Sequence, residues 1–490
     1  MITSLSAYAC DFLVSMWISI ADFVILCHIP NNMINRFKRV ILLGGDILLL
    51  YVTLYLALFL RHQHFPTHAI WNENFWPFTL LFVVWVGIFY INGLYEIFAS
   101  KNDVEFYNKI LRNLLLNFGF GIAYFYLLTD KLFDIKPQTV FLIFSALFTV
   151  IFLGWRFWYN SFVKRPTMLK NVLVLGMNDE ARELVEEIIK KPQLGFRISA
   201  IIHDGYRANA EFPGVEIFNS SIAIKKLLKK NNIETVVTVL DPQSNPELLR
   251  QLFDSLSLRL QFFDLPSFYE KLTGKIPVTN IGHIWFLENL AESEKQYYEG
   301  TKRIIDLLAS LVGGVISLVF LPFLALLVKS SSPGPVFFKQ MRVGAGGKPF
   351  LAIKLRTMYT DAEKDGQPQW AAKDDPRITR IGKFLRKTRL DEIPQLLNVL
   401  RGDMSIVGPR PERPEFVRQL QELIPFYNER HLIRPGLTGW AQINFQYGAS
   451  AGDALKKLQY DLFYVKNRSL ILDAGIILKT LNIIFSGKGR

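Results

Sequence analysis

The stretch Arg386-Lys387-Thr388-Arg389-Leu390-Asp391-Glu392-Ile393-Pro394-Gln395 places two adjacent carboxylates at a predicted helix start, among several cationic side chains. Pro394 suits the first turn of a helix, where its missing N–H costs nothing, so Asp391 is predicted at or near the N-cap. An apolar helix face would follow, formed by Leu396, Leu397 and Leu400. This stretch is therefore predicted to be the helical frame of a polar site.

The two carboxylates have two interpretations. A helix N-terminus with arginines around it favours phosphate, a carboxylate there can attack phosphorus, and its neighbour can hold a divalent metal ion. The alternative is structural: Asp391 caps the helix, Glu392 lies at the surface, and the basic residues form a solvated face. The pair alone does not separate the two.

Cationic residues on either side of this stretch are suited to phosphate, because arginine forks match phosphate oxygens. Arg410 lies between two prolines in Gly408-Pro409-Arg410-Pro411, and this rigidity lowers the ordering cost of a phosphate clamp. An ordinary surface arginine is the alternative. Lys354 and Arg356 alternate with apolar neighbours in a predicted β-hairpin around Gly344–Gly347, so both are expected on one face.

The net charge of the chain is unevenly distributed. Residues 301–490 carry 29 Lys+Arg and 16 Asp+Glu, whereas residues 1–300 carry 27 of each, so the whole excess of +13 lies in the C-terminal part. Such a basic region suits phosphorylated substrates, anionic lipid headgroups or nucleic acid. We expect no nucleic acid partner, because no zinc-finger, helix-turn-helix or RNP pattern is present. Cys10 and Cys27 are too few for a disulfide framework.

The composition, 50% hydrophobic and 14% aromatic, indicates a membrane protein. Segments with close to the ~20 apolar residues that cross a bilayer lie at about 40–60, 76–95, 111–129 and 138–158. Basic residues flank the first and the last segment, namely Arg36, Lys38, Arg39, Arg156, Lys164, Arg165 and Lys170. The positive-inside rule then places both ends of this four-helix unit in the cytoplasm. Residues 12–29 are a weaker candidate span, and no signal peptide is expected.

Residues 170–240 change to a soluble α/β pattern. Strands are predicted at 171–176, 198–202 and 235–240, with helices at 179–191 and 222–230 between them, which indicates a parallel, Rossmann-like sheet. The first turn, Gly176-Met177-Asn178-Asp179-Glu180-Ala181, keeps only one glycine of the G-x-G-x-x-G fingerprint and adds two acids. This argues against dinucleotide binding and for a structural, regulatory or oligomerisation role.

A further apolar segment, 304–328, is long enough to cross the bilayer. Crossing would carry the residues after it out of the cytoplasm, so we expect a helix that enters and leaves on the same side. Pro322 would break the helix, because proline cannot donate a hydrogen bond there. Lys302 and Arg303 are expected at lipid headgroups. An ordinary fifth span kinked at Pro322 is the alternative.

Several ordered motifs lie between about Tyr298 and Arg490. They are Lys302-Arg303-x-x-Asp306, Ser332-Pro333-Gly334-Pro335-Val336-Phe337-Phe338, Lys354-Leu355-Arg356-Thr357-Met358, Arg434-Pro435-Gly436-Leu437-Thr438-Gly439-Trp440-Ala441-Gln442 and Tyr460-Asp461-x-x-Tyr464. With the Asp-Glu stretch, this part of the chain resembles the bacterial sugar transferases, which attach sugar 1-phosphates to polyprenyl phosphate to start exopolysaccharide, capsule or O-antigen units. Large members of that family have the same order of membrane helices, Rossmann-like module and catalytic domain.

The resemblance implies a covalent mechanism. Asp391 would attack the sugar-bearing phosphorus of a UDP-sugar and expel UMP, and undecaprenyl phosphate would then take the sugar phosphate from the enzyme. Glu392 would hold Mg2+, and the re-entrant helix would bend at Pro322. The phosphate- and substrate-binding candidates are Lys354, Arg356, Arg377, Arg380, Arg386, Arg410, Arg434 and Asp461. For the Arg434–Gln442 motif, a packed turn with Trp440 in the core is an equal alternative.

We therefore expect a multidomain membrane protein of the bacterial inner membrane, with its catalytic domain facing the cytoplasm. Its predicted parts are an N-terminal segment of open status (1–35), an α-helical transmembrane bundle (36–160), a Rossmann-like α/β module (168–290) and an α+β monotopic catalytic domain (298–490) with a re-entrant helix at about 302–328. The expected partners are a UDP-sugar, polyprenyl phosphate, the lipid bilayer and a second copy in a homodimer.

Other functions fit parts of the sequence. A membrane glycosyltransferase would release UDP instead of UMP, so the leaving group separates it from a phosphosugar transferase. A non-enzymatic scaffold could sense a nucleotide with the α/β module while the basic domain docks on lipid. A nucleotide-sugar epimerase is disfavoured by the broken glycine fingerprint. The identity of the sugar is not specified by the sequence.

Overall fold

The structure is a computed structural model that describes residues 33–96, 102–127, 138–163, 169–203, 212, 214–219, 224–239, 246–258, 260–290, 295–362, 375–445 and 450–485. The chain divides into two compact units, Met1–Leu272 and Thr273–Arg490. The weak candidate span at 12–29 and both cysteines lie outside the described residues. The predicted domain limits stay predictions.

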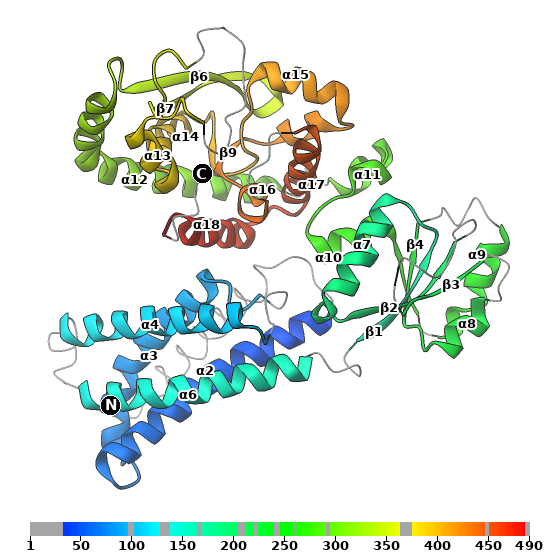
Figure 1. Cartoon of the computed structure of the whole chain (residues 1–490), viewed down its shortest axis with the longest axis horizontal. Coiled ribbons are helices and arrows are strands. Elements are labelled where there is room, and N and C mark those ends of the chain that lie inside the picture. Colours follow the sequence, from blue (N-terminus) through cyan, green and yellow to red (C-terminus); the bar gives the residue numbers. More distant parts are fainter. Residues whose placement is uncertain are drawn as a thin grey trace. The chain divides into compact units, whose positions relative to one another are not determined.

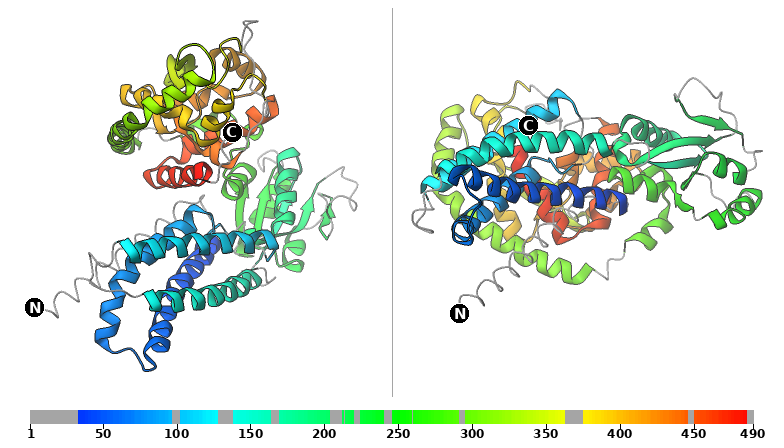
Figure 2. Two further views of the ribbon diagram at one scale, coloured as in Figure 1. Left: turned by 60° about the vertical axis from the view of Figure 1, so that its left-hand side comes forward. Right: turned by 90° about the horizontal axis from the view of Figure 1, so that it is seen from below.

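The first unit begins with a helical bundle. Its helices are α2 (Met33–His62), α3 (His68–Ile91), α4 (Val104–Leu127) and α6 (Gln138–Val163). The blue α2 and cyan α6 pack side by side along much of their length (Figures 1 and 2). Aromatic rings fill the interior: Trp85 contacts both Phe144 and Phe148, which stack on each other. A helix is therefore present at each of the four predicted bundle positions.

Four described helices are long and apolar enough to cross a membrane: α2, α3, α6 and α12 (Gln296–Ser331). The helix predicted as a span at 111–129 is present as α4 but is not among these four. Its apolar run is interrupted by Arg112, Asn113 and Asn117. Asn113 and Asn117 are buried in the bundle, so α4 supplies it with internal polar side chains.

A fully buried ion pair joins α2 to α6. Arg156 Nη2 lies 2.5 Å from Asp46 Oδ2, and neither side chain is exposed. Trp155 Nε1 donates to Asp46 Oδ1 at 2.9 Å, and Arg156 Nη1 donates to the carbonyl of Leu94. The charge of Arg156 is therefore paired inside the bundle. The topology prediction had counted Arg156 as a flanking positive charge, because the sequence does not show which carboxylate pairs with it.

A five-stranded parallel sheet follows in the order β3-β2-β1-β4-β5. Its strands are β1 (Lys170–Leu175), β2 (Phe196–Ile202), β3 (Glu216–Phe218), β4 (Thr235–Thr238) and β5 (Gln261–Asp264). The helices are α7 (Asp179–Lys190), α8 (Ile224–Lys230), α9 (Pro246–Phe253) and α10 (Leu265–Thr273). The predicted parallel sheet is thus confirmed, and the prediction missed β3 and β5.

Helices cover both faces of this sheet, as Figure 2 shows for the green ribbon. Val172 and Val174 of β1 pack in one core cluster with α7 and α10. Leu173 and Leu175, which point to the other face, pack with α8 and α9. At the first turn, Asn178 caps α7 by accepting from the N–H of Ala181 at 2.8 Å. The chain's own side chain therefore satisfies a donor at the helix end where a pyrophosphate would lie in a dinucleotide-binding fold.

The second unit is α+β. It contains α11 (His283–Asn289), α12 (Gln296–Ser331), β6 (Phe337–Val343), β7 (Pro349–Leu355), α13 (Arg380–Thr388), η9 (Leu390–Gln395), α14 (Leu396–Arg401), β8 (Ser405–Val407), α15 (Pro414–Leu423), η10 (Tyr427–Leu432), β9 (Gly436–Thr438), α16 (Trp440–Asn444), α17 (Ala451–Asn467) and α18 (Leu470–Phe485). β6 and β7 form the predicted antiparallel hairpin, and β8 pairs with β9 in parallel.

Both ends of α12 are attached to this unit. Near its start, Asp306 Oδ1 accepts from the N–H of Ile406 at 3.2 Å. Near its end, Leu324 and Val328 join a core cluster with β7 and α13. The middle exposes a run of large apolar side chains: Leu311, Val312, Val315, Ile316, Leu318, Val319, Phe320 and Phe323. The helix is continuous through Pro322, so the break that was predicted at this proline is not present.

Trp440 anchors the segment that precedes α11. Its ring is buried, stacks on Phe463 and donates through Nε1 to the carbonyl of Gly274 at 3.0 Å. Phe286 of α11 in turn packs on Phe426. The alternative of a packed turn with Trp440 in the core is therefore the correct one for this tryptophan.

Candidate active site

The Asp-Glu pair lies in a 3₁₀ helix, η9, and not at the start of an α-helix. Asp391 and Glu392 are in the first turn of η9, and α14 begins only at Leu396. The chain turns from α13 into η9 at Arg389, whose φ of 56° and ψ of 18° are left-handed. The N-cap prediction for Asp391 is therefore wrong, because the left-handed residue redirects the chain and Gln395 occupies the N-cap of α14.

Glu392 is held by cations from three elements. Its Oε1 lies 2.5 Å from Arg410 Nη2 and 3.3 Å from Lys354 Nζ, and its Oε2 lies 3.5 Å from Arg389 Nη1. Burial opposes the charge of this carboxylate, but Arg410, Lys354 and Arg389 together lower its pKa far below the ordinary value. Glu392 is therefore ionised and fixed.

Asp391 differs from its neighbour in having no such partner. Its side chain is buried, with 7% of the residue exposed, yet no hydrogen bond or ion pair reaches its carboxylate from the residues that the structure describes. Burial and then the negative charge of Glu392 raise the pKa of Asp391. The arrangement thus places a carboxylate whose oxygens have no partner among the described residues beside one that is immobilised.

The cations around the pair exceed the two carboxylates. Burial lowers the pKa of Lys354 to about 8 and that of Arg342 to about 10, and it also lowers the pKa of Arg389. A lowered pKa means that the local carboxylates do not fully compensate these charges. The site therefore favours an anion with several charges, such as a diphosphate.

Arg410 comes from the loop between β8 and α15, and hydrogen bonds fix the main chain of this loop on both sides. They run from Gly408 N to Thr438 O (2.9 Å), Gly436 N to Pro409 O (2.9 Å), Arg430 Nη2 to Arg410 O (2.9 Å) and Arg342 Nη1 to Pro411 O (3.1 Å). A Cβ on Gly436 would collide with the backbone of Gly408, so glycine is required there. The predicted rigidity of the loop thus comes from these bonds as well as from its prolines.

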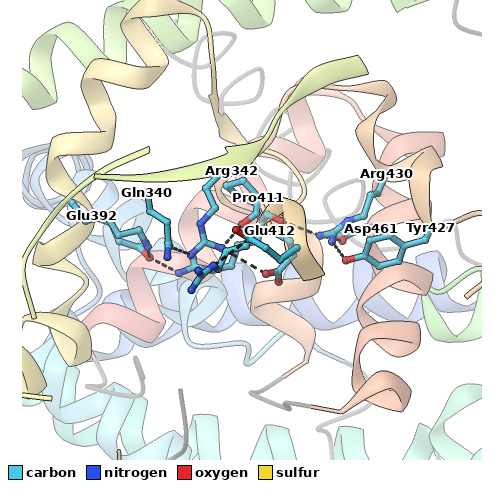
Figure 3. Close-up of polar contacts among 12 residues, drawn as sticks. Gln340, Arg342, Glu392, Pro411, Glu412, Tyr427, Arg430 and Asp461 are labelled. Carbon is cyan, nitrogen blue, oxygen red and sulfur yellow. Dashed lines mark hydrogen bonds and ion pairs between the residues drawn. The ribbon is translucent and has the colours of Figure 1, made fainter. Parts of the chain in front are cut away.

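Arg430 is itself held by a buried pair, drawn in Figure 3. Its Nη2 lies 2.7 Å from Asp461 Oδ2, and its Nη1 donates to Tyr427 Oη at 2.6 Å. Asp461 is 1% exposed, so it does not face a substrate. Its predicted role in substrate binding is corrected: it binds Arg430, which binds the carbonyl of Arg410.

Two predicted phosphate ligands are used elsewhere. Arg356 donates to the carbonyls of Ser332 and Pro333 at 2.6 and 2.8 Å, and it thereby holds the turn that follows α12. Lys354 and Arg356 therefore do not share one task on one face, since β7 ends between them. Arg377 forms a two-pronged ion pair with Asp375, with its shortest bond at 2.6 Å. Both arginines are structural in the positions that the structure gives them.

The remaining phosphate-binding candidates are Arg386, Arg380 and Arg434, and they have different contacts. Arg386 Nε donates to Thr357 Oγ1 at 2.8 Å, and its charge acts on Asp391. Arg380 is exposed in the first turn of α13. Arg434 is exposed and lines a small cavity with Lys302 and Asp306. Within the described residues, no contact joins Arg380 or Arg434 to Asp391 or Glu392.

The two residues predicted at lipid headgroups are engaged inside the unit. Lys302 Nζ lies 2.6 Å from Asp473 Oδ2 and is buried. Arg303 donates to the carbonyls of Val399 and Leu400 at 2.7 and 2.9 Å, at the C-terminal end of α14. The structure differs from the prediction here because a helix C-terminus and an internal carboxylate satisfy these cations.

Two cations of the site were not predicted. Arg389 belongs to the quoted stretch, where its place between two helical segments could have indicated a special backbone conformation. Arg342 lies in β6, and no motif in the sequence marks it. Only the pairing of β6 with β7 brings it to the same side of the unit as Lys354 and Arg410.

The carboxylates of Asp391 and Glu392 are suitable ligands for a divalent ion, but they do not form a complete set of protein ligands. No group of three or more His, Cys, Asp or Glu side chains that could hold a metal occurs in the described part of the chain. Mg2+ in phosphoryl-transfer sites is held by one or two carboxylates together with substrate phosphates and water. Asp391 and Glu392 fit that pattern, provided that phosphate takes over the cations now bound to Glu392.

The part of the chain that contains this site matches a protein family. Residues 297–487 match the family described as bacterial sugar transferase. These residues include η9 and the whole site described above.

Individual relatives extend the comparison. A UDP-glucose:undecaprenyl-phosphate glucose-1-phosphate transferase from Klebsiella pneumoniae is 30% identical over 465 residues, which cover 92% of this chain and 94% of the relative. One with the same name from Escherichia coli K12 is 34% identical, covering 63% and 66%. A UDP-N-acetylgalactosamine-undecaprenyl-phosphate N-acetylgalactosaminephosphotransferase from Aeromonas hydrophila is 44% identical over 45% of this chain, and the match spans about half (51%) of that protein.

Proposed function

This chain belongs to the bacterial sugar transferase family, and we propose that it transfers a sugar 1-phosphate from a UDP-sugar to undecaprenyl phosphate. By its relatives it is a polyprenyl-phosphate phosphoglycosyltransferase. The products are undecaprenyl-diphosphate-sugar and UMP, and the reaction would start the assembly of an exopolysaccharide, capsule or O-antigen unit. The relatives are named for glucose or N-acetylgalactosamine, so the sugar is left to experiment.

The observation that carries this proposal is the contrast between Asp391 and Glu392. One carboxylate is buried without a partner among the residues that the structure describes, and the adjacent one is bound to Arg410, Lys354 and Arg389. A polyanionic substrate entering this site would gain those cations, and the phosphorus would then lie within reach of Asp391.

The proposed chemistry has two displacement steps. In the first, an Asp391 carboxylate oxygen forms a bond to the sugar-bearing phosphorus, the bond from that phosphorus to the UMP oxygen breaks, and UMP leaves. In the second, an oxygen of undecaprenyl phosphate attacks the same phosphorus, and the bond to Asp391 breaks to regenerate the carboxylate. Arg410 and Lys354 neutralise phosphate charge in both steps. Mg2+, when bound by Glu392 and the diphosphate, would supply further charge neutralisation.

The membrane arrangement that we propose is based on the contacts of α12. Its apolar middle is exposed, while Asp306 before it and Val328 after it both contact the same unit. A helix fastened to one polar unit at both ends enters and leaves the bilayer on one side, which supports a re-entrant helix. We propose that this side is the cytoplasmic face of the inner membrane, where UDP-sugars occur. We also interpret the α/β region of the first unit as Rossmann-like from its strand order.

The test is a leaving-group assay on purified membranes containing the full chain, with undecaprenyl phosphate and a panel of UDP-sugars. We expect UMP release with at least one UDP-sugar, and UMP formation in an amount equal to the lipid-linked product. Acid quenching before lipid is added should trap a phospho-sugar adduct on the protein, located by mass spectrometry at Asp391.

Three results would contradict the proposal in different ways. Release of UDP would indicate transfer of the sugar alone. Product formation without any adduct would remove the covalent route but keep the reaction. Absence of any lipid-linked product with every UDP-sugar would leave a non-enzymatic membrane scaffold as the better interpretation.

A further inference from the structure

The backbone at Arg389 has a conformation that is unfavourable for arginine. Its φ of 56° and ψ of 18° are left-handed, and its N–H donates back to the carbonyl of Arg386, as at the end of many helices. Glycine is the usual residue at such a helix end because it has no Cβ to clash. Arginine therefore adds a steric cost at this position that glycine would not have.

The guanidinium of Arg389 is directed into the site and is incompletely satisfied. Its side chain is 19% exposed, and its one ion pair among the described residues is with Glu392 Oε2 at 3.5 Å. Its buried Nε has no hydrogen-bond partner there. An arginine has five N–H donors, so most of them have no protein acceptor.

Arg410 provides the contrast within the same site. It binds the same carboxylate at 2.5 Å, and Glu392 raises its pKa even though burial opposes its charge. Glu392 is thus already neutralised by Arg410, with Lys354 at 3.3 Å as a further cation. Arg389 is not required to compensate Glu392, and its free donors are available to an anion that the protein itself does not contain.

We propose that Arg389 is a substrate-binding residue whose guanidinium contacts the diphosphate of the nucleotide sugar, and this rests on the proposed function. The neighbouring Asp391 brings the reacting phosphorus within two residues of Arg389 along the chain. The left-handed (αL) backbone of Arg389 is energetically unfavourable, and it directs this side chain at the phosphates from the end of α13. The same chemistry could come from the phosphate of the lipid substrate, so the test separates the two.

The experiment uses three substitutions in the full chain, each with a distinct effect on backbone and charge. Arg389→Gly removes both the side chain and the αL strain, Arg389→Ala removes the side chain and keeps the strain, and Arg389→Lys keeps the charge and the strain. Gln63→Gly is the matched control, because Gln63 is exposed and ends α2 with a φ of 57°. Binding of UDP and of uridine is measured by calorimetry, and Tm by thermal unfolding.

For Arg389→Gly we expect a Kd for UDP raised about tenfold, a Kd for uridine unchanged, and a Tm equal to or above that of the wild type. Arg389→Ala should bind UDP equally weakly with a lower Tm, and Arg389→Lys should recover part of the affinity. The KM for the UDP-sugar should rise while the KM for undecaprenyl phosphate stays the same. Gln63→Gly should raise Tm without changing either Kd.

Wild-type affinity for UDP in Arg389→Gly would overturn this inference and leave the proposed function intact. A rise in the KM for undecaprenyl phosphate alone would overturn it as well, because the contact would then be with the lipid phosphate. If the wild-type chain bound neither UDP nor a UDP-sugar and formed no product, both the inference and the proposed function would fail.

Discussion

Two arginine–carboxylate clusters in the second unit have opposite charge balance. At Arg430, one guanidinium faces Asp461 and Tyr427 in a closed, buried set of contacts. Around Glu392, the cations Lys354, Arg389 and Arg410 surround one ionised carboxylate, next to Asp391, which has no partner in the described part of the chain. In the first cluster the cation has its own anion, although Arg430 Nε and Asp461 Oδ2 have no hydrogen-bond partner among the described residues. In the second cluster three cations surround one ionised carboxylate. Residue types alone do not show this difference in charge balance, but the contacts do.

The pKa of Arg430 differs from those of Arg389 and Lys354 in the second cluster, whereas the pKa of Arg410 is raised like that of Arg430. Although burial opposes the charge of Arg430, Tyr427 and Asp461 raise its pKa above the ordinary value. Burial lowers the pKa of Arg389 and Lys354 instead. A cation with a lowered pKa gains stability when an anion enters, whereas a fully paired one gains little. The comparison therefore predicts which substitutions affect activity and which affect folding.

The largest effect is expected from Asp391→Asn. Loss of the nucleophile should lower kcat by about 10³-fold or more. The Tm should not fall, because a raised pKa means that the ionised carboxylate costs stability at neutral pH and the amide carries no charge. The two measurements are UMP release and thermal unfolding, with the exposed Asp254→Asn as a control. Substantial activity in Asp391→Asn, or a clearly lower Tm, would contradict the assignment.

Breaking the closed cluster should mainly affect folding. Asp461→Asn leaves a buried guanidinium without its anion, and such losses cost about 3–5 kcal/mol. The double variant Arg430→Met/Asp461→Leu should recover much of the Tm, because no buried charge then remains unpaired. It should stay less active than the wild type, since the carbonyl of Arg410 has lost its donor. A double variant with full kcat/KM would show that Arg430 does not position Arg410.

A smaller effect is expected from Arg410→Lys. Lysine keeps the charge but cannot bind phosphate or Glu392 with two parallel N–H groups. We expect kcat/KM to fall about 10- to 30-fold with little change in Tm, because charged hydrogen bonds contribute about 1.5–3 kcal/mol. Arg401→Lys, at the exposed end of α14, is the matched control. Equal kcat/KM in both variants would mean that Arg410 acts only as a point charge.

The smallest effect is expected in the pH profile. Lys354 has a pKa of about 8, so it loses its positive charge as pH rises through 8. The KM for the UDP-sugar should then rise, by about three- to tenfold between pH 7 and 9. Lys354→Arg should remove this rise, because arginine stays charged. At low pH, kcat should fall as Asp391 is protonated, beginning above the pH usual for a carboxyl because its pKa is raised.

Much of the architecture could be predicted from the sequence. The helices of the bundle, the strands β1, β2 and β4 and the hairpin β6–β7 follow from apolar runs, alternation and glycine turns. The Asp-Glu pair, Lys354 and Arg410 were identified as site residues by motif and charge, and the structure brings them together. These features are local, so a short window of sequence contains the information that determines them.

Several errors concern residues whose partner is distant in the sequence, whereas Arg377 pairs with Asp375 only two residues away. Arg156 was counted as a flanking charge although it pairs with Asp46, 110 residues away. Asp461 and Lys302 were assigned to substrate and lipid, but their partners Arg430 and Asp473 are in other elements. The N-cap prediction for Asp391 failed because the left-handed conformation of Arg389 starts a 3₁₀ helix. None of these partners can be read from spacing along the chain.

The sequence by itself determined the order of the parts, the membrane-like segments and the two carboxylates on which the proposed chemistry depends, because composition and local pattern specify helices, strands and motifs. Only the tertiary structure decided which charges are paired. It closed Arg430 onto Asp461 and Tyr427, gathered Arg410, Lys354 and Arg389 around Glu392, and left Asp391 without a partner. The reason is physical: the pKa and availability of a charged group depend on burial and on neighbours within a few ångströms, and folding alone supplies both.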